Sequence, residues 1–234
     1  MDAQDWLDRV FIDPAVMELR PDYAAVVIVA EGLRPGPSDD ASDALLTMAQ
    51  KQARKMLPPG GVAELAPVAA WRQAYQGFGA KPKRTRPSVE ALLRRLDAGL
   101  PRIDRLTDVY NAMSVRHVVP VGGEDLDRYT GAARLVRAVG GEPFDTTRDG
   151  QPVVDHPEPG EVVWRDDAGV TCRAWNWRQC VRTRITYSTT RAMFIFDGLA
   201  ELGADPLEAA RVDLIEHLSA LNPGATLAWR KLSG

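Results

Sequence analysis

The residues best suited to chemistry are gathered in one stretch, 108–127. Asn111 comes first, Pro-Val-Gly-Gly follows at 120–123, and the acids Glu124 and Asp125 come directly after it. Adjacent glycines let a ligand approach the main chain closely, and paired acids beside a flexible turn can bind an ammonium group or orient a water molecule. The pattern predicts one wall of a binding pocket. The alternative is that either acid only caps the short segment that follows.

Two further groups of polar residues are candidates for the same pocket. Ser114, Arg116 and His117 precede the glycines, although a single histidine after an amphipathic helix is more often a structural residue. Much later, Trp-Asn-Trp-Arg at 175–178 places asparagine and arginine on one face and the tryptophans on the other, if this segment is extended. We expect the polar pair to face a ligand and the tryptophans to face the core.

Several classes of site have no counterpart in the sequence. It contains no Gly-x-Ser-x-Gly elbow, no phosphate-binding loop and no His-Glu-x-x-His. Cys172 and Cys180 are too few for a disulfide framework or a zinc motif, so we expect reduced thiols and neither a metal nor a cofactor. The longest apolar run, 24–30, is too short for a bilayer, and residues 1–5 lack the features of a secretory signal. These observations favour a cytoplasmic protein with no membrane contact.

The charge of the chain is unevenly distributed. Its 234 residues have a net charge of −3, yet residues 81–105 and 172–191 each carry +5. Two arginine-rich windows in an otherwise acidic chain are compatible with an anionic ligand of limited footprint, such as a phosphate or an RNA end. The alternative is that the arginines only solvate helix faces and strand edges.

The elements that must position these residues change character near residue 131. The unbroken β-branched run 23–30 is typical of a strand buried on both faces. The other signals are mostly helical before residue 131 and mostly extended after it, so the predicted fold class is α+β, with helices concentrated in the first half and a mixed or antiparallel sheet in the second. We predict helices at 42–56, 67–77, 88–99 and 205–222, a helix leading into a glycine turn at 120–123, and strands at 133–139, 161–165, 170–175 and 184–190.

Four short segments together resemble a known family. They are Pro-Ser-Val-Glu-Ala-Leu-Leu-Arg-Arg at 87–95, Leu-Pro-Arg-Ile at 100–103, Asp-Val-Tyr-Asn-Ala-Met-Ser at 108–114 and Pro-Val-Gly-Gly-Glu-Asp-Leu-Asp at 120–127. The string is similar to the B3/B4 domain of the phenylalanyl-tRNA synthetase β subunit in its free-standing form. The resemblance covers about residues 20–200 and implies a single B3/B4-like domain over 1–234, with helical extensions at both ends. Nothing resembles the synthetase catalytic core or its ATP-binding motifs, so ATP is not expected as a partner.

The resemblance implies a function in tRNA editing. The synthetase domain hydrolyses tyrosine wrongly attached to the phenylalanine tRNA, with a positioned water and without a covalent nucleophile. By analogy the chain is expected to be a trans-editing aminoacyl-tRNA deacylase whose partner is a tRNA acceptor end. The residues expected to act are Asn111, Gly122, Gly123, Glu124 and Asp125 in catalysis, Ser114, Arg116, His117, Asn176, Arg178 and Thr186 in substrate binding, and Arg84, Arg86, Arg94 and Arg95 in RNA binding.

One position departs from the family's pattern. The synthetase domain has Pro-x-His-x-x-Asp, whereas this chain has glycine at the histidine position, Gly122. Tyrosine selectivity is therefore not expected, and the missing side chain is expected to open the pocket. The family's acidic recognition residue falls near residues 196–197. Two alternatives stay open: a module that binds an amino acid or aminoacyl-RNA without hydrolysing it, and a hydrolase of small molecules. The sequence indicates no oligomeric state.

Overall fold

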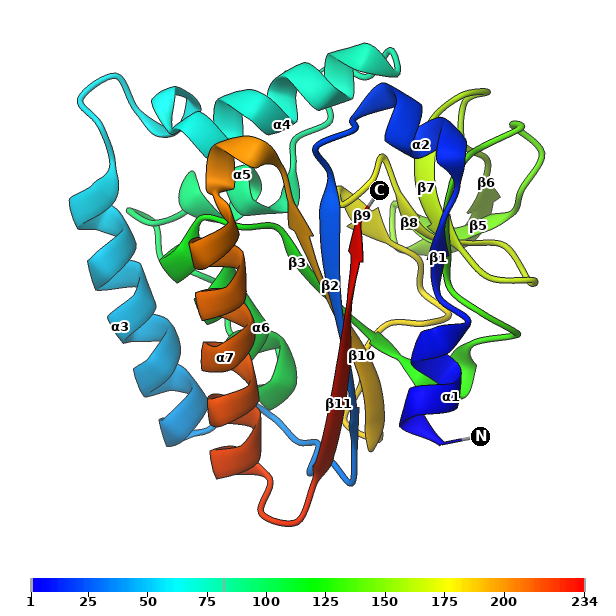
Figure 1. Cartoon of the computed structure of the whole chain (residues 1–234). Coiled ribbons are helices and arrows are strands. Elements are labelled where there is room, and N and C mark those ends of the chain that lie inside the picture. The colour runs from blue at the N-terminus through cyan, green and yellow to red at the C-terminus, as the bar shows by residue number, and fades with distance from the viewer. Residues whose placement is uncertain (1, 82, 234) are drawn as a thin grey trace.

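A four-stranded antiparallel sheet forms the centre of the molecule. The computed structural model describes residues 2–81 and 83–233. The strand order is β11 (Thr226–Ser233), β2 (Ala24–Glu31), β10 (Arg191–Gly198) and β3 (Val121–Asp125). The six inner residues of β2 are buried, as expected for an unbroken β-branched run with cover on both faces. Figure 1 shows that β3 lies beside β10, away from β11.

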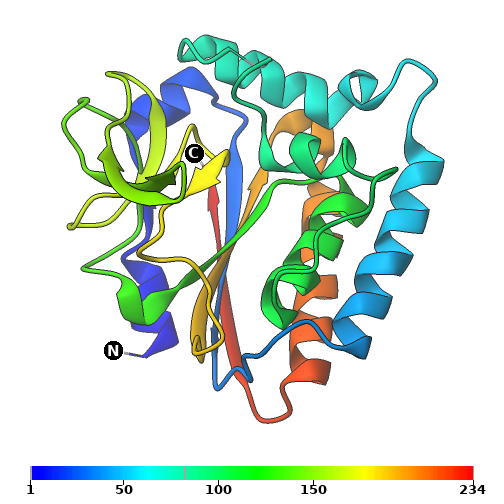
Figure 2. The same cartoon turned by 180° about the vertical axis from the view of Figure 1, so that it is seen from behind.

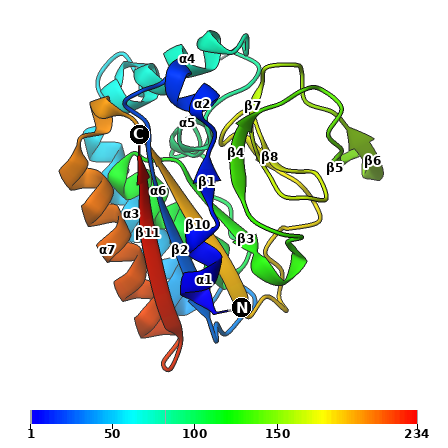
Figure 3. The ribbon, with the colours of Figure 1, turned by 45° about the vertical axis from the view of Figure 1, so that its right-hand side comes forward.

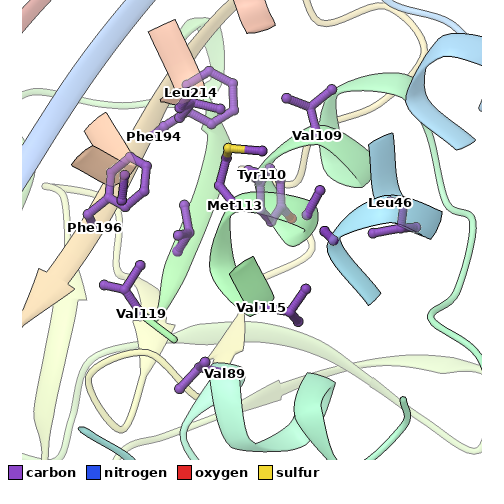
Figure 4. Packing of buried hydrophobic residues seen from close by; sticks show 14 of the residues in the cluster. Leu46, Val89, Val109, Tyr110, Met113, Val115, Val119, Phe194, Phe196 and Leu214 are labelled. Atoms are coloured by element: carbon purple, nitrogen blue, oxygen red, sulfur yellow. The ribbon is translucent and has the colours of Figure 1, made fainter. Parts of the chain in front are cut away.

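Three long helices cover one face of this sheet, as Figures 1 and 2 show. They are α3 (Asp40–Met56), α6 (Arg105–His117) and α7 (Ala204–Leu221). Met113 and Tyr110 of α6 lie between Leu46 of α3 and the phenylalanines of β10, Phe194 and Phe196 (Figure 4). The apolar stripe of α6 therefore fixes its position between α3 and the sheet, and this packing places the polar residues of α6 beside β3.

A smaller sheet lies on the opposite side of the central one (Figure 3). Its order is β1 (Phe11–Ile12), β4 (Arg134–Arg137), β7 (Val162–Arg165), β8 (Val170–Arg173) and β9 (Arg178–Gln179). Only the pairing of β1 with β4 is parallel. The hairpin of β5 (Phe144–Arg148) and β6 (Gln151–Asp155) projects from this sheet. The predicted α+β class, with helices early and sheets later, is confirmed.

The remaining elements close the ends of the two sheets. The short helices α1 (Ala3–Asp8) and α2 (Pro14–Leu19) precede β2, and α4 (Ala66–Gly77) and α5 (Ser88–Leu93) precede α6. Three single 3-10 turns lie at Val62–Glu64, Leu126–Arg128 and Ala200–Leu202. Within the described chain, no helix combines the length and the hydropathy required to cross a bilayer.

Three local predictions were wrong. Gly122 and Gly123 belong to strand β3 rather than to a turn, because they pair with Ile195 and Phe194 of β10. The helix predicted at 88–99 ends at Leu93. The segment predicted as a strand at 184–190 forms only an isolated bridge, between Glu124 and Arg184. For Gly122 and Gly123, pairing with β10 prevailed over local turn propensity.

The start of α3 and the end of the chain also differ from the predictions. Ser42 is not the cap of α3; Asp39 is, and the two residues form a capping box, which stabilises a helix start by about 1 kcal/mol. After α7 the chain returns as β11 and pairs with β2 along its whole length. Neither end of the described chain is purely helical.

Candidate functional site

One cavity lies where β3, α5, α6 and the smaller sheet meet. Its volume is about 290 Å³, close to the lower limit of ordinary ligand pockets. The sheet provides the inner surface, the first half of α6 provides one wall and residues 172–179 provide the other. Arg95 and Arg178, both exposed, also line the cavity.

Register places two acids on the same face of the central sheet. Gly122 pairs with Ile195, and the Asp197 N–H donates to the Pro120 carbonyl at 3.1 Å. Because side chains alternate along a strand, Glu124, Gly122, Ile195 and Asp197 all face the cavity. Four residues of register separate the two acids, or roughly 13 Å at ~3.3 Å per residue. Gly122 and Ile195 form the floor between them.

Glu124 is the acid at one end of this floor. Its side chain accepts a hydrogen bond from the Tyr129 hydroxyl, which lies 3.1 Å from Thr171 Oγ1. Burial raises the pKa of Glu124 to about 7, against the hydrogen bonds that favour its charged form. At neutral pH the carboxyl is therefore divided between its acid and base forms.

Asp197 is the acid at the other end and is held by a chain of hydrogen bonds. The Tyr23 hydroxyl donates to Oδ1 at 2.5 Å, and Asn176 Nδ2 donates to Oδ2 at 3.2 Å. The Tyr75 hydroxyl donates to Asn176 Oδ1 at 2.9 Å, so Tyr75 orients the amide. Burial is again the main cause that raises the pKa of Asp197 to about 7. The acid expected near 196–197 is this residue, whereas no sequence signal pointed to either tyrosine.

A strained turn positions Asn176. Ala174 and Trp175 have φ values of 44° and 65°, which are costly for residues with a Cβ atom. Glu161 Oε1 accepts the Ala174 N–H at 2.8 Å. Trp175 packs edge-on against Trp71, with ring centroids 5.2 Å apart. The extended conformation predicted for 175–178 is therefore wrong: Trp175 enters the core, and Asn176 turns toward Asp197.

Asn111 of α6 lines the cavity, and its side-chain amide makes no hydrogen bond within the described chain. It is 7% exposed, and its amide has no hydrogen-bond partner among residues 2–81 and 83–233. A buried amide without a partner is costly. This group is therefore available to a ligand.

Gly123 has main-chain polar groups at the edge of β3 that faces away from β10. Its carbonyl accepts Gln179 Nε2 at 2.8 Å, and the Asp125 N–H donates to the Thr183 carbonyl, so this edge of β3 points away from β10. By strand alternation the Gly123 N–H points the same way. No acceptor for it occurs in the described part of the chain. Gly123 does not line the cavity, however, so this N–H is a donor at the strand edge beside Gln179 and not a group on the cavity surface.

Asp125 has a structural environment. Its carboxylate accepts the Thr189 hydroxyl at 2.7 Å and the Asp127 N–H at 3.0 Å, and it does not line the cavity. The alternative considered for the acids, capping of the following segment, describes Asp125 and not Glu124.

Four predicted substrate-binding residues lie away from the cavity. Ser114 is buried and donates to the Val119 carbonyl at 2.7 Å. Arg116 and His117 contact Asp213 of α7, at 2.7 and 2.8 Å. Thr186 is exposed in a turn. Asn111 and His117 are six residues apart on α6, about 9 Å along the helix axis, which explains why neighbours in sequence are not neighbours in the site.

The four predicted RNA-binding arginines form two pairs, one that contacts Glu90 of α5 and one that does not. It is fully buried and accepts hydrogen bonds from Arg72 and Arg94 at 2.7 Å, with Arg86 at 3.9 Å. Burial raises the pKa of Glu90, but these arginines outweigh it and the net shift is downward. Arg86 and Arg94 thus have an acidic partner, which they share with Arg72. Arg84 and Arg95 are exposed, with no ionic partner in the described chain.

Comparisons with known proteins identify a family and a similar solved structure. A sequence profile of the B3/4 domain matches residues 70–203, and no curated protein matches the chain. Among solved structures, an N-terminal fragment of the phenylalanyl-tRNA synthetase β-subunit from Pyrococcus horikoshii is similar, with 14% identity and a TM-score of 0.48. The alignment covers 96% of this chain and 54% of that fragment, so the chain spans about half its length. Because the profile matches more than half of the 234 residues, the chain belongs to the B3/4 domain family.

Proposed function

We propose that the chain is a trans-editing aminoacyl-tRNA deacylase, which hydrolyses the ester of a wrongly charged tRNA. The observation that carries the proposal is the cavity floor, where Gly122 leaves an open surface between the buried acids Glu124 and Asp197. A volume of about 290 Å³ suits an aminoacyl group. Membership of the B3/4 family is consistent with this reading. Such a reaction belongs in the cytoplasm.

The two acids are assigned different roles. Asp197 is fixed by Tyr23 and Asn176, so it anchors a polar group of the substrate amino acid. Glu124 has a pKa of about 7, which makes its carboxylate a stronger base than an ordinary one and suits it to take a proton from the attacking water. The Asn111 amide, which lines the cavity, is available to the ester carbonyl oxygen as negative charge develops on it.

Neither the Cys172 thiol nor the Ser88 hydroxyl is activated as a nucleophile, so the proposed attack on the ester is by water. Cys172 lines the cavity, but burial raises the pKa of its thiol well above the usual value, and the thiolate is the nucleophilic form. Ser88 also lines the cavity, but its buried Oγ has no hydrogen-bond partner in the described chain and hence no activating base.

A panel of aminoacylated tRNAs tests the proposal. The expected result is loss of the ester from at least one of them, faster than in buffer and dependent on Glu124. If wild type and Glu124→Gln release amino acids at the buffer rate from every tRNA, the deacylase assignment is wrong.

The second candidate is a module that binds aminoacyl-RNA without turnover. It is favoured by the absence of histidine from the cavity lining in the described chain, since His156 and His217, like His117, lie elsewhere. Salt-dependent tRNA binding without hydrolysis would support it. Turnover of aminoacyl esters without any affinity for tRNA would instead support a hydrolase of small molecules.

A further inference from the structure

A second cavity adjoins the first. Its volume is about 310 Å³, and both cavities are lined by Trp177. The same two segments border both: 81–88 and 173–178. They are joined where the Ser88 N–H donates to the Asn176 carbonyl at 3.2 Å. A ligand that extends beyond the first cavity at this side meets the second.

The charges of the second cavity are only partly balanced. Arg173 is paired with Glu161 at 2.7 Å. Lys81 and Arg84 are exposed, and neither side chain has an ion pair or a hydrogen bond within residues 2–81 and 83–233. The exposed acid Glu158 also lines this cavity and opposes them.

Unpaired cations continue from the second cavity to the mouth of the first. The Arg178 guanidinium lies over the Trp177 ring, 4.6 Å from its centroid, and Arg95 lines the first cavity. No ionic partner for Arg95 or Arg178 is found in the described chain. The nearby arginines 86 and 94 are held by Glu90. The free cations thus mark one path across the surface, from Lys81 to Arg95.

We infer that this second cavity binds the backbone phosphate of an RNA 3′ end whose aminoacyl group occupies the first cavity. Lys81 and Arg84 contact the phosphate, and Trp177 with Arg178 separates the phosphate from the ester. Two exposed cations at a cleft recognise a phosphodiester by charge, and the shared Trp177 wall allows one ligand to occupy both cavities. The inference rests on the proposed function, because that function supplies the aminoacyl end.

The test is binding of fluorescently labelled, uncharged tRNA to the full chain over a range of salt concentrations. Lys81→Ala/Arg84→Ala is compared with Lys51→Ala/Lys55→Ala, which removes the same charge from exposed positions on α3 that line neither cavity. We expect about tenfold weaker binding for the first variant. The slope of log affinity against log salt should fall by about 0.7, the value for one single-strand phosphate contact. Glu158→Gln should strengthen binding.

Several results would overturn the inference: no tRNA binding by wild type, equal effects of the two double variants, or competition by polyglutamate as effective as competition by RNA. The last result would assign the cavity to an acidic peptide. Hydrolysis is measured separately, as the ratio of rates on aminoacyl-tRNA and on aminoacyl-adenosine, which has no phosphate. We expect this ratio to fall about tenfold in Lys81→Ala/Arg84→Ala. If nothing is hydrolysed but the binding results hold, the deacylase proposal fails and the phosphate site stands.

Discussion

At the scale of single residues, the site depends on two carboxyl groups whose surroundings differ. Both are 2% exposed, and burial raises both pKa values to about 7. Asp197 accepts two hydrogen bonds from neutral donors that are themselves fixed. Both oxygens of Asp197 accept such a bond, whereas Glu124 accepts the Tyr129 hydroxyl on Oε2 and has the Thr171 hydroxyl as a further partner. We therefore assign anchoring to Asp197 and proton transfer to Glu124.

Glu124→Gln tests this assignment. The amide keeps the shape but cannot accept a proton, so kcat for the best aminoacyl-tRNA should fall about 100-fold or more while KM changes little. In wild type, kcat/KM should rise with pH through about 7 as Glu124 ionises. Rates are measured between pH 5.5 and 8.5.

Asp197→Asn is the companion variant. It should mainly raise KM and change the order of preferred amino acids, because Asp197 is assigned to anchoring rather than proton transfer. An identical loss of kcat in both variants would contradict the division of roles.

At the scale of elements, strand β3 carries two adjacent glycines for different reasons. A Cβ atom at Gly123 would lie 2.8 Å from side-chain carbons of Tyr110 and Ile185. A Cβ atom at Gly122 would meet only Gln179 Nε2, at 3.1 Å, the end of a flexible side chain. Gly123 is required by the packing of α6 on the sheet, and Gly122 is required by the open floor.

The two alanine variants should therefore separate stability from activity. Gly123→Ala should lower the free energy of unfolding by about 1–3 kcal/mol through overpacking. Gly122→Ala should unfold close to the wild-type denaturant midpoint but process the preferred substrate more slowly, because its methyl group enters the floor. Urea melts and deacylation rates are measured on both. Loss of stability in Gly122→Ala with unchanged activity would refute this account of the floor.

Helix α5 depends on the ion-pair cluster around Glu90. Glu90→Gln would leave Arg72 and Arg94 without their buried counter-charge, at a cost of roughly 3 kcal/mol. Glu208→Gln is the matched control, since the pair between Glu208 and Arg211 is on the surface and should contribute close to nothing. Urea denaturation at pH 7 compares the two. Equal midpoints would show that the Glu90 cluster does not stabilise the fold.

At the scale of the whole molecule, the cavity lies at the junction of two sheets and the helices α5 and α6, so the site and the core share residues. Tyr23, Trp71 and Trp175 pack edge to face behind Asp197. Burial among these rings is the physical cause of the raised pKa of Asp197, and Glu124 is buried at the other end of the floor. Stability and site chemistry are therefore linked through the same two acids.

The linkage predicts a pH dependence of stability. The pKa values of Glu124 and Asp197 rise from ordinary values of 4.5 and 3.8 to about 7 in the folded chain. Between these limits the folded state binds more protons than the unfolded state, so the free energy of unfolding should fall as pH rises from about 5 to 7 and then level off. Urea melts from pH 5 to 8 measure it. Glu124→Gln/Asp197→Asn should flatten the profile, and an unchanged slope would contradict the raised pKa values.

The sequence alone determined the class of the fold and part of the site. The β-branched run that became β2 and the apolar stripe of α6 are local patterns that report burial. The string at 108–127 identified Asn111, Gly122, Gly123 and Glu124 as neighbours, because three of them lie on one short strand and the fourth faces it from the preceding helix. The family resemblance was carried by the same string.

Only the tertiary structure decided which arginines stay unpaired and which two acids face the same cavity. Glu90 contacts Arg86 and Arg94 at helical i,i+4 spacing, but its third partner, Arg72, comes from α4 through packing that no local spacing predicts. Asp197 comes from a strand 72 positions beyond Asp125, and the pairing of β3 with β10 places it opposite Pro120. The positive φ values at 174–175 form a turn, so residues 175–178 do not show the alternating faces of an extended strand. These features depend on register and long-range packing, which local sequence constrains weakly because a shift of one residue exchanges the two faces of a strand.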